Sequence, residues 1–231
     1  MEHPVNVFAF ISIPVAAMTV GAAATTLRRP GPQLTSAIQH FAAGVVFAAA
    51  AGEILPDLKH DGAQIPVLIG GLAGIAVMLL VKHLGAKAKG NTGFVAVIGT
   101  DILIDGLVLG IGFAAGARQG LLLTLALTLE VLFLGVTVAI SLGSGGLSRG
   151  RVIASTFAMG LLLPLGALAG GPIASLPPAI VTGFFAFGLI ALLYLVTEEL
   201  LVEAHETQET PLITAMFFLG FLASLLIEEA L

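Results

Sequence analysis

Long apolar stretches alternate along the chain with short segments rich in glycine, proline or charge. A helix needs about 20 residues to cross the hydrocarbon core of a bilayer. Eight stretches come near this length: residues 5–27, 34–55, 65–81, 94–115, 121–142, 152–168, 179–202 and 211–231. The third and the sixth are the shortest, and the breakers between the stretches leave no room for a soluble domain. The pattern predicts an all-α polytopic membrane protein with a single transmembrane domain over residues 1–231.

The composition agrees with this pattern and excludes several classes of function. Hydrophobic residues make up 58% of the chain and charged residues only 10%, with a mean hydropathy of +1.09, whereas soluble domains carry about 25% charged residues. The chain has no cysteine, so disulfides and thiolate metal sites are excluded. A net charge of −5 offers no basic surface for nucleic acid. No catalytic pair stands out at a suitable spacing, and we expect the protein not to be an enzyme.

The basic residues indicate how the spans are oriented. The first stretch lacks the basic leader of a signal peptide, so we expect it to be a span. With the N-terminus outside, the outer loops hold only Lys59 and Arg118. The cytoplasmic loops then hold the other seven: Arg28, Arg29, Lys82, Lys87, Lys89, Arg149 and Arg151. This asymmetry follows the positive-inside rule and predicts that both termini lie outside.

Three acids interrupt the apolar fourth and fifth spans. Asp101 and Asp105 in "GTDILIDGLVLGIGF" are four residues apart and share one helix face, and Glu130 lies near the middle of the next span. An ionisable residue at the bilayer centre costs about 2.5–3.5 kcal/mol on insertion scales. Antiparallel spans bring the three carboxylates to one depth with no lysine or arginine partner in these spans. A divalent cation would hold them ionised; the alternative is a protonated acid hydrogen-bonded between helices.

A second acidic pattern occurs near the ends of spans 2 and 7. The segments "GEILPDLKH" and "EELLVEAHE" align so that Glu53 matches Glu199 and Asp57 matches Glu203. The further candidate ligands of this pattern are Glu198 and His205. Because the two spans run in opposite directions, the clusters would lie at opposite membrane surfaces, as in an inverted repeat. The alternative is that both are ordinary polar helix ends facing water.

Other polar and small residues are expected to support packing. Gly106, Gly110 and Gly116 would let helices approach closely, as small residues do in membranes. His40 lies about 20 Å along span 2 from Glu53. We expect His40 to be a packing or interfacial histidine rather than a ligand.

Four segments occur in an order that resembles one known family. Residues 41–58 read "FAAGVVFAAAAGEILPDL", and they are followed by "DILIDG" at 101–106, "EVLFLG" at 130–135 and "GLLLPLGALAG" at 160–170. In this order the chain resembles the ZIP (Zrt/Irt-like) metal transporters over nearly its whole length. The resemblance places Asp101 and Asp105 at the His and Glu positions of the family pattern His-Asn-x-Pro-Glu-Gly. It also places Glu130 first in the span-5 pattern, and it implies eight helices in a 3+2+3 inverted repeat with both termini outside.

The departures from the family pattern change the expected site. The family often holds two metals between spans 4 and 5, with support from span 6. Here Ile102, Leu134 and Leu163 stand at positions where the family has polar ligands. The resemblance therefore implies a mononuclear site formed by Asp101 and its two partner acids. Oxygen ligands suit harder cations such as Mn²⁺ and Mg²⁺, although Zn²⁺ also accepts carboxylates.

The acids and the resemblance together predict a carrier of divalent metal cations that works by alternating access. Its substrate would be Mn²⁺, Fe²⁺, Zn²⁺ or a similar ion, with no prosthetic group. We expect it in the cell membrane of a bacterium, the inner membrane, with the lipid bilayer and the metal ion as partners; a homodimer is compatible and nucleic acid is not. Two alternatives stay open: a non-transporting relative that senses metal or is structural, and a proton-coupled carrier of another solute.

Overall fold

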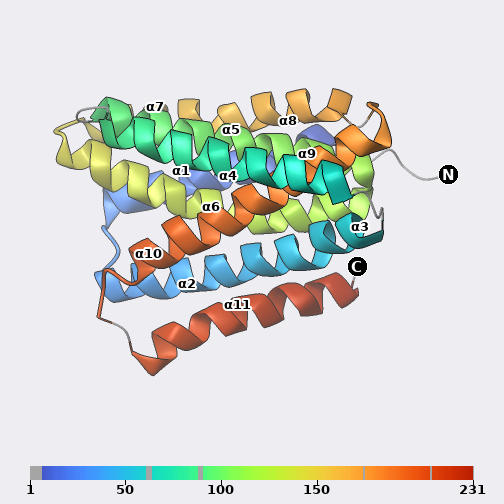
Figure 1. The fold of residues 1–231 in the computed structure, drawn as a ribbon. Helices are drawn as coiled ribbons and strands as arrows, with labels where there is room; N and C mark the ends of the chain where they lie inside the picture. The colour runs from blue at the N-terminus through green and yellow to red at the C-terminus, as the bar shows by residue number, and fades with distance from the viewer. Residues whose placement is uncertain (1–6, 61–63, 88–90, 174, 209, 231) are drawn as a thin grey trace. The chain divides into compact units, whose positions relative to one another are not determined.

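Helices account for all regular secondary structure in the described residues of the computed structural model, which are 7–60, 64–87, 91–173, 175–208 and 210–230 (Figure 1). Eight of the helical segments are long and apolar enough to cross a membrane. The sequence-based prediction of an all-helical chain with eight such segments is therefore confirmed. The expectation of one transmembrane domain stays a prediction.

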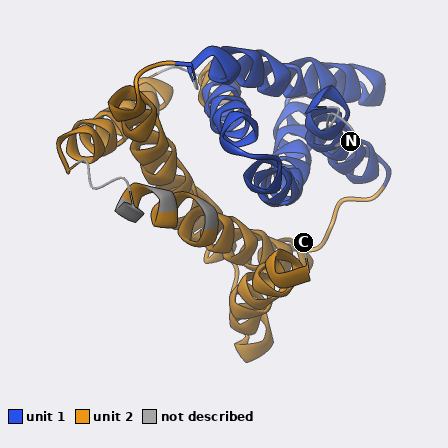
Figure 2. Cartoon of the chain, turned by 90° about the vertical axis from the view of Figure 1, so that its right-hand side faces the viewer, with its two compact units in different colours: residues 1–27, 98–175 blue, residues 28–97, 176–231 orange. Residues whose placement is uncertain are grey.

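The described helices divide into two compact units, shown in Figure 2. Unit 1 comprises residues 1–27 and 98–175, and unit 2 comprises residues 28–97 and 176–231. The helices of unit 1 are α1 (Val7–Leu27), most of α5 (Asn91–Ala115), α6 (Ala117–Ser144), α7 (Arg149–Gly160) and α8 (Leu162–Ile173). The helices of unit 2 are α2 (Pro32–Ala49), η1 (Ala50–Ile54), α3 (Leu55–His60), α4 (Gln64–Lys87), α9 (Pro178–Tyr194), η2 (Leu195–Leu200), α10 (Leu201–Ala204) and α11 (Pro211–Ala230).

The observed helices extend into segments that the sequence analysis assigns to breakers. The third and sixth spans, predicted to be short, measure 22 and 25 residues over Gln64–Gly85 and Arg149–Ile173. Between α5 and α6, Gly116 alone is not helical, so Arg118 begins a helix rather than a loop. Among the described residues, only the turn after α6 needs a special residue, because Gly146 has a φ of 86°.

Three of the spans are interrupted, and two of the interruptions have a local cause. Span 6 breaks between α7 and α8, where Pro164 cannot donate a hydrogen bond to Gly160. Span 2 widens into the π-helical segment η1, and Pro56 would clash with the carbonyl of Gly52 in a regular α-helix. Span 7 contains the π-helical segment η2, which forms without a nearby proline. π-Helical segments are rare and often mark functional sites.

In unit 1, glycines bring the backbones of neighbouring helices together. A Cβ atom on Gly106 would lie 2.0 Å from the carbonyl oxygen of Leu163, and one on Gly110 would lie 2.2 Å from that of Ala167. The constant offset between these pairs shows that α5 and α8 run parallel. The packing role expected of both glycines is confirmed, but that of Gly116 is wrong. Gly116 lies in the connection, where the atoms nearest to an added Cβ would be those of the Gln119 side chain.

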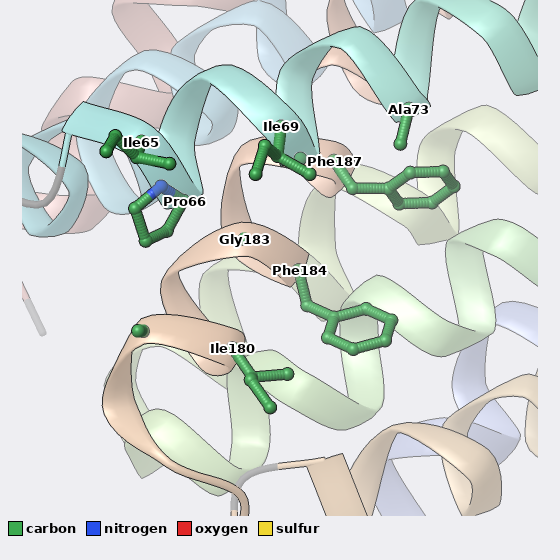
Figure 3. A pocket seen from close by; sticks show the side chains of 10 residues that line it. Ile65, Pro66, Ile69, Ala73, Ile180, Gly183, Phe184 and Phe187 are labelled. Atoms are coloured by element: carbon green, nitrogen blue, oxygen red, sulfur yellow. The ribbon is translucent and has the colours of Figure 1, made fainter.

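In unit 2, glycines allow the same close backbone contact in two further helix pairs. A Cβ on Gly44 of α2 would lie 2.0 Å from the carbonyl oxygen of Phe217 in α11. A Cβ on Gly70 of α4 would lie 1.9 Å from that of Gly183 in α9. Beside this second contact, an apolar pocket opens between α4 and α9, lined by residues such as Ile69 (Figure 3). The pocket presents no charged side chain and offers no ligand to a cation.

Candidate metal centre

Three buried carboxylates from α5 and α6 meet inside unit 1. Asp101, Asp105 and Glu130 are 3%, 2% and 0% exposed. One ligand oxygen from each can be chosen so that all three lie within 4.8 Å of one another. Within the described residues, no other group of three metal-ligating side chains meets this condition. The structure thus brings together the three acids that the sequence analysis grouped in one site.

The short connection between α5 and α6 sets the depth of the acids. Gly112 packs on Leu123 across this connection, so the two helices form a tight antiparallel hairpin around Gly116. Asp105 lies 11 residues before Gly116 and Glu130 lies 14 residues after it. A difference of three residues is only about 4.5 Å of helix rise. The four-residue spacing of Asp101 and Asp105 then stacks both on the face that meets α6.

The surroundings of these acids are apolar. Ile102, Leu134 and Leu163 are all buried, and none of them can donate an oxygen or nitrogen ligand from its side chain. The backbone of Leu163 lies against Gly106, directly after Asp105 in the chain. The positions at which the family resemblance leads one to expect a second set of ligands are therefore filled by hydrocarbon.

The two helices that carry the cluster contain only one basic side chain in their described residues. α5 contains no lysine or arginine, and α6 contains only Arg118 near its start, 12 residues before Glu130. Up to three negative charges in an apolar setting need compensation, since an uncompensated buried charge is strongly destabilising. Ligand oxygens around one octahedral cation lie about 3–4 Å apart, so oxygens within 4.8 Å need only a small shift to share an ion.

The outer candidate ligands fall where the side chains are not described. Glu53 lies in η1 and Asp57 in α3, but both side chains lie outside the described part of the chain. A neighbour that the sequence analysis missed is Glu228 of α11, whose Oε2 would lie 2.9 Å from a Cβ on Gly52. The sequence feature that could have indicated Glu228 is the acidic pair at the end of α11. Such a pair also occurs at ordinary polar helix ends, so it did not stand out.

The candidate ligands on span 7 have protein partners in unit 2. Glu198 accepts a hydrogen bond from Lys82 at 2.9 Å, and this pair is also an ion pair. Glu203 accepts one from Gln39 at 2.7 Å. Gln39 was missed because its partner lies 164 residues away and leaves no periodic pattern in the sequence. Glu199, the remaining acid, is only partly exposed.

The last candidate, His205, lies beside His40. The ring centroids are 5.1 Å apart, and His40 is 2% exposed. His40 Nδ1 faces the carbonyl oxygen of Ser36 at 2.9 Å, while the Ser36 hydroxyl donates to the carbonyl of Ala204 at 2.7 Å. These contacts place the start of α2 beside the end of α10. His40 lies in a helix contact, as expected of a packing histidine.

Comparison of the chain with protein-family models and with curated protein sequences gives no match. The family resemblance therefore stands on the order of its four segments and on the three carboxylates.

Proposed function

We propose that this protein is a multi-pass membrane carrier of divalent metal cations, related to the ZIP transporters. The observation that carries the proposal is the meeting of Asp101, Asp105 and Glu130, buried in apolar helices that are long enough to span a membrane. A cation with two positive charges compensates acids in such a setting. Most of both helices is buried against other helices, and we propose that a bound cation compensates the three carboxylates at one depth.

The helix contacts support the inverted repeat that this proposal includes. If spans 1–3 correspond to spans 6–8, a contact between spans 2 and 8 must be matched by one between spans 7 and 3. Both contacts exist as close glycine packings, α2 on α11 and α4 on α9. The contact of α1 with α6 is likewise matched by that of α8 with α5. The π-helical segments η1 and η2 also fall at corresponding positions, since adding 146 to 50–54 gives 196–200.

Two contacts within unit 2 agree with the relative directions of its spans in this topology. The Lys82–Glu198 pair joins the ends of spans 3 and 7, which the proposed topology places on the cytoplasmic side. The Gln39–Glu203 bond joins the start of span 2 to the end of span 7, on the same side. We propose that both termini are outside, that Glu53 and Asp57 receive the cation there, and that Glu199, Glu203 and His205 release it inside. The membrane we propose is a bacterial inner membrane.

The donor set supports harder cations as substrates. All three ligands are carboxylates, which suit Mn²⁺ and Mg²⁺ and also accept Fe²⁺ and Zn²⁺. One metal per chain is the expected occupancy, because Ile102, Leu134 and Leu163 supply no further ligands.

The test is uptake of a panel of divalent metals into proteoliposomes that contain the purified full-length chain. Saturable uptake of Mn²⁺ or Fe²⁺ is the expected result, and it should disappear in Asp105→Asn. Glu229→Gln is the matched control, since it neutralises an exposed carboxylate outside the centre. Unchanged uptake in Asp105→Asn would remove that residue from the site.

The apolar residues at the family's ligand positions also favour a second candidate function. Buried Ile102, Leu134 and Leu163 fit a relative that binds one metal but no longer transports it. Such a protein would bind Mn²⁺ in detergent and show no uptake. Proton flux without any metal uptake would instead indicate a proton-coupled carrier of another solute.

A further inference from the structure

One lysine of unit 2 is held at the cytoplasmic end of a spanning helix by two side chains from span 7. Lys82 Nζ lies 2.9 Å from Glu198 Oε2 and 5.7 Å from the ring centroid of Tyr194. The side chains of Lys82 and Glu198 are 57% and 48% exposed. An ion pair in which both side chains are so exposed adds little to stability. Its position therefore calls for a reason other than folding.

The lysine lies among the acids proposed to release the cation. Glu199 follows Glu198 directly in the chain, and Glu203 lies one helical turn further on. Glu203 accepts a hydrogen bond from Gln39, so both acids belong to the same end of span 7 as the ion pair. Lys82 is thus a tethered positive charge at the edge of this acidic cluster.

The other end of unit 2 shows the opposite arrangement. The offset of 146 residues that equates η1 with η2 places Gly52 at the position of Glu198. The neighbour of Glu198 is the ammonium of Lys82 from α4, whereas the neighbour of Gly52 is the carboxylate of Glu228 from α11. Related positions thus carry a cation on the side proposed as cytoplasmic and an acid on the side proposed as external.

We propose that Lys82 is a built-in competitor of the transported cation, which lowers the affinity of the inner acids for metal and so promotes release into the cytoplasm. This inference rests on the proposed function. A divalent ion that reaches Glu199 is repelled by the ammonium and must compete with it for the carboxylates. The external side has Glu228 in the related place, which attracts the ion. The asymmetry of charge would favour loading outside and unloading inside.

The experiment measures the affinity for Mn²⁺ from the cytoplasmic side, as the half-saturating concentration for flux from that side of oriented proteoliposomes. Lys82→Gln removes the competitor and should tighten this affinity by about three- to tenfold, because exposed charges interact modestly and are screened by salt. Glu198→Gln removes an acid and leaves the ammonium, so it should weaken the affinity. The double variant should return close to the wild type. Lys87→Gln is the matched control, since Lys87 is exposed at the end of the same helix.

A purely structural ion pair gives a different result. Either single variant would then change the affinity in the same direction, and this outcome overturns the proposal, as does a Lys82→Gln variant that equals Lys87→Gln. Lys82→Arg keeps the charge and should behave as the wild type, which shows whether a loss comes from misfolding. If the wild type shows no saturable flux, the proposed function fails. Mn²⁺ binding to the Asp105→Asn chain, with and without Lys82→Gln, then tests the competition alone, and equal binding overturns it.

Discussion

At the scale of single residues, the burial of three acids in unit 1 has an energetic consequence for the empty protein. Asp101, Asp105 and Glu130 are 0–3% exposed, so water cannot solvate their charges. Without a cation they repel one another or must take up protons. In the empty protein this repulsion or protonation costs free energy, and a bound cation would relieve that cost.

Replacing Glu130 by Gln should therefore act in opposite directions with and without metal. The empty variant should be more stable than the empty wild type, because one buried charge is gone. Stabilisation by Mn²⁺ should be lost, since binding to the folded state raises the unfolding temperature only where the site exists. Thermal unfolding in detergent with and without Mn²⁺ measures both effects. A variant that keeps the full metal-dependent shift would show that Glu130 is no ligand.

The buried leucines predict the number of metals. With Leu134 and Leu163 in place of polar ligands, crystals soaked in Cd²⁺ should show one anomalous peak beside Asp101. Two-metal sites have ions about 3.5–4 Å apart. A second peak at that spacing would show that water or backbone oxygens replace the missing side chains.

The sequence predicts this centre but not the contacts of the acidic residues in unit 2, for a physical reason. The spacing of Asp101 and Asp105 and the depth of Glu130 follow from helix geometry alone. The partners Gln39 and Glu228 contact residues far away in the chain, and such contacts leave no periodic signal.

At the scale of helices, backbone contacts at glycine hold the site. Gly106 follows Asp105, and the carbonyl of Leu163 occupies the space that a side chain would need. The close approach of α5 and α8 therefore depends on the missing Cβ.

Gly106→Ala should destabilise the folded protein by about 1–3 kcal/mol, the usual cost of overpacking. It should also reduce metal uptake, because α5 carries two ligands. Gly150→Ala is the control: it lies in α7 with nothing within 4 Å of its added Cβ. This variant should be neutral or slightly more stable, since alanine favours helices over glycine. Chemical unfolding of both variants in detergent measures the difference, and equal effects would contradict the packing role.

Helix ends and interruptions follow only partly from the sequence. Helices continue through Gly143 and Gly171 because a backbone inside a bilayer must satisfy its hydrogen bonds internally. Pro56 and Pro164 mark two interruptions, but η2 has Val202 where the offset places Pro56. The residues of η2 contain no local feature from which a π-helical segment could be predicted.

At the scale of the whole molecule, the acids at the two ends of unit 2 should affect transport differently. A negative entrance raises the local cation concentration, and salt screens this effect over about 10 Å at 0.1 M. Glu53→Gln with Asp57→Asn should therefore raise the KM for uptake and weaken its salt dependence. Glu199→Gln with Glu203→Gln should change turnover and leave KM nearly unaltered.

Uptake kinetics at two salt concentrations separate these effects. Equal changes from both double variants would argue against entrance and exit on opposite sides. They would also argue against the proposed orientation of spans 2 and 7.

The division into two units has a consequence for how the chain is made. Unit 1 takes its first helix from residues 1–27 and the rest from 98–175, so unit 2 residues are synthesised between its parts. During translation α1 must therefore remain in the bilayer without its partner α6 while spans 2, 3 and 4 are inserted. The exposed apolar side chains of α1, such as Phe8 and Val20, are compatible with a helix that is surrounded by lipid until α6 is inserted. Unit 2 is completed last, after residue 175, so Asp101, Asp105 and Glu130 can meet while the scaffold of the second unit is still half built. Insertion factors that shield polar residues would be needed most between the emergence of α5, which carries Asp101 and Asp105, and that of α6, which carries Glu130.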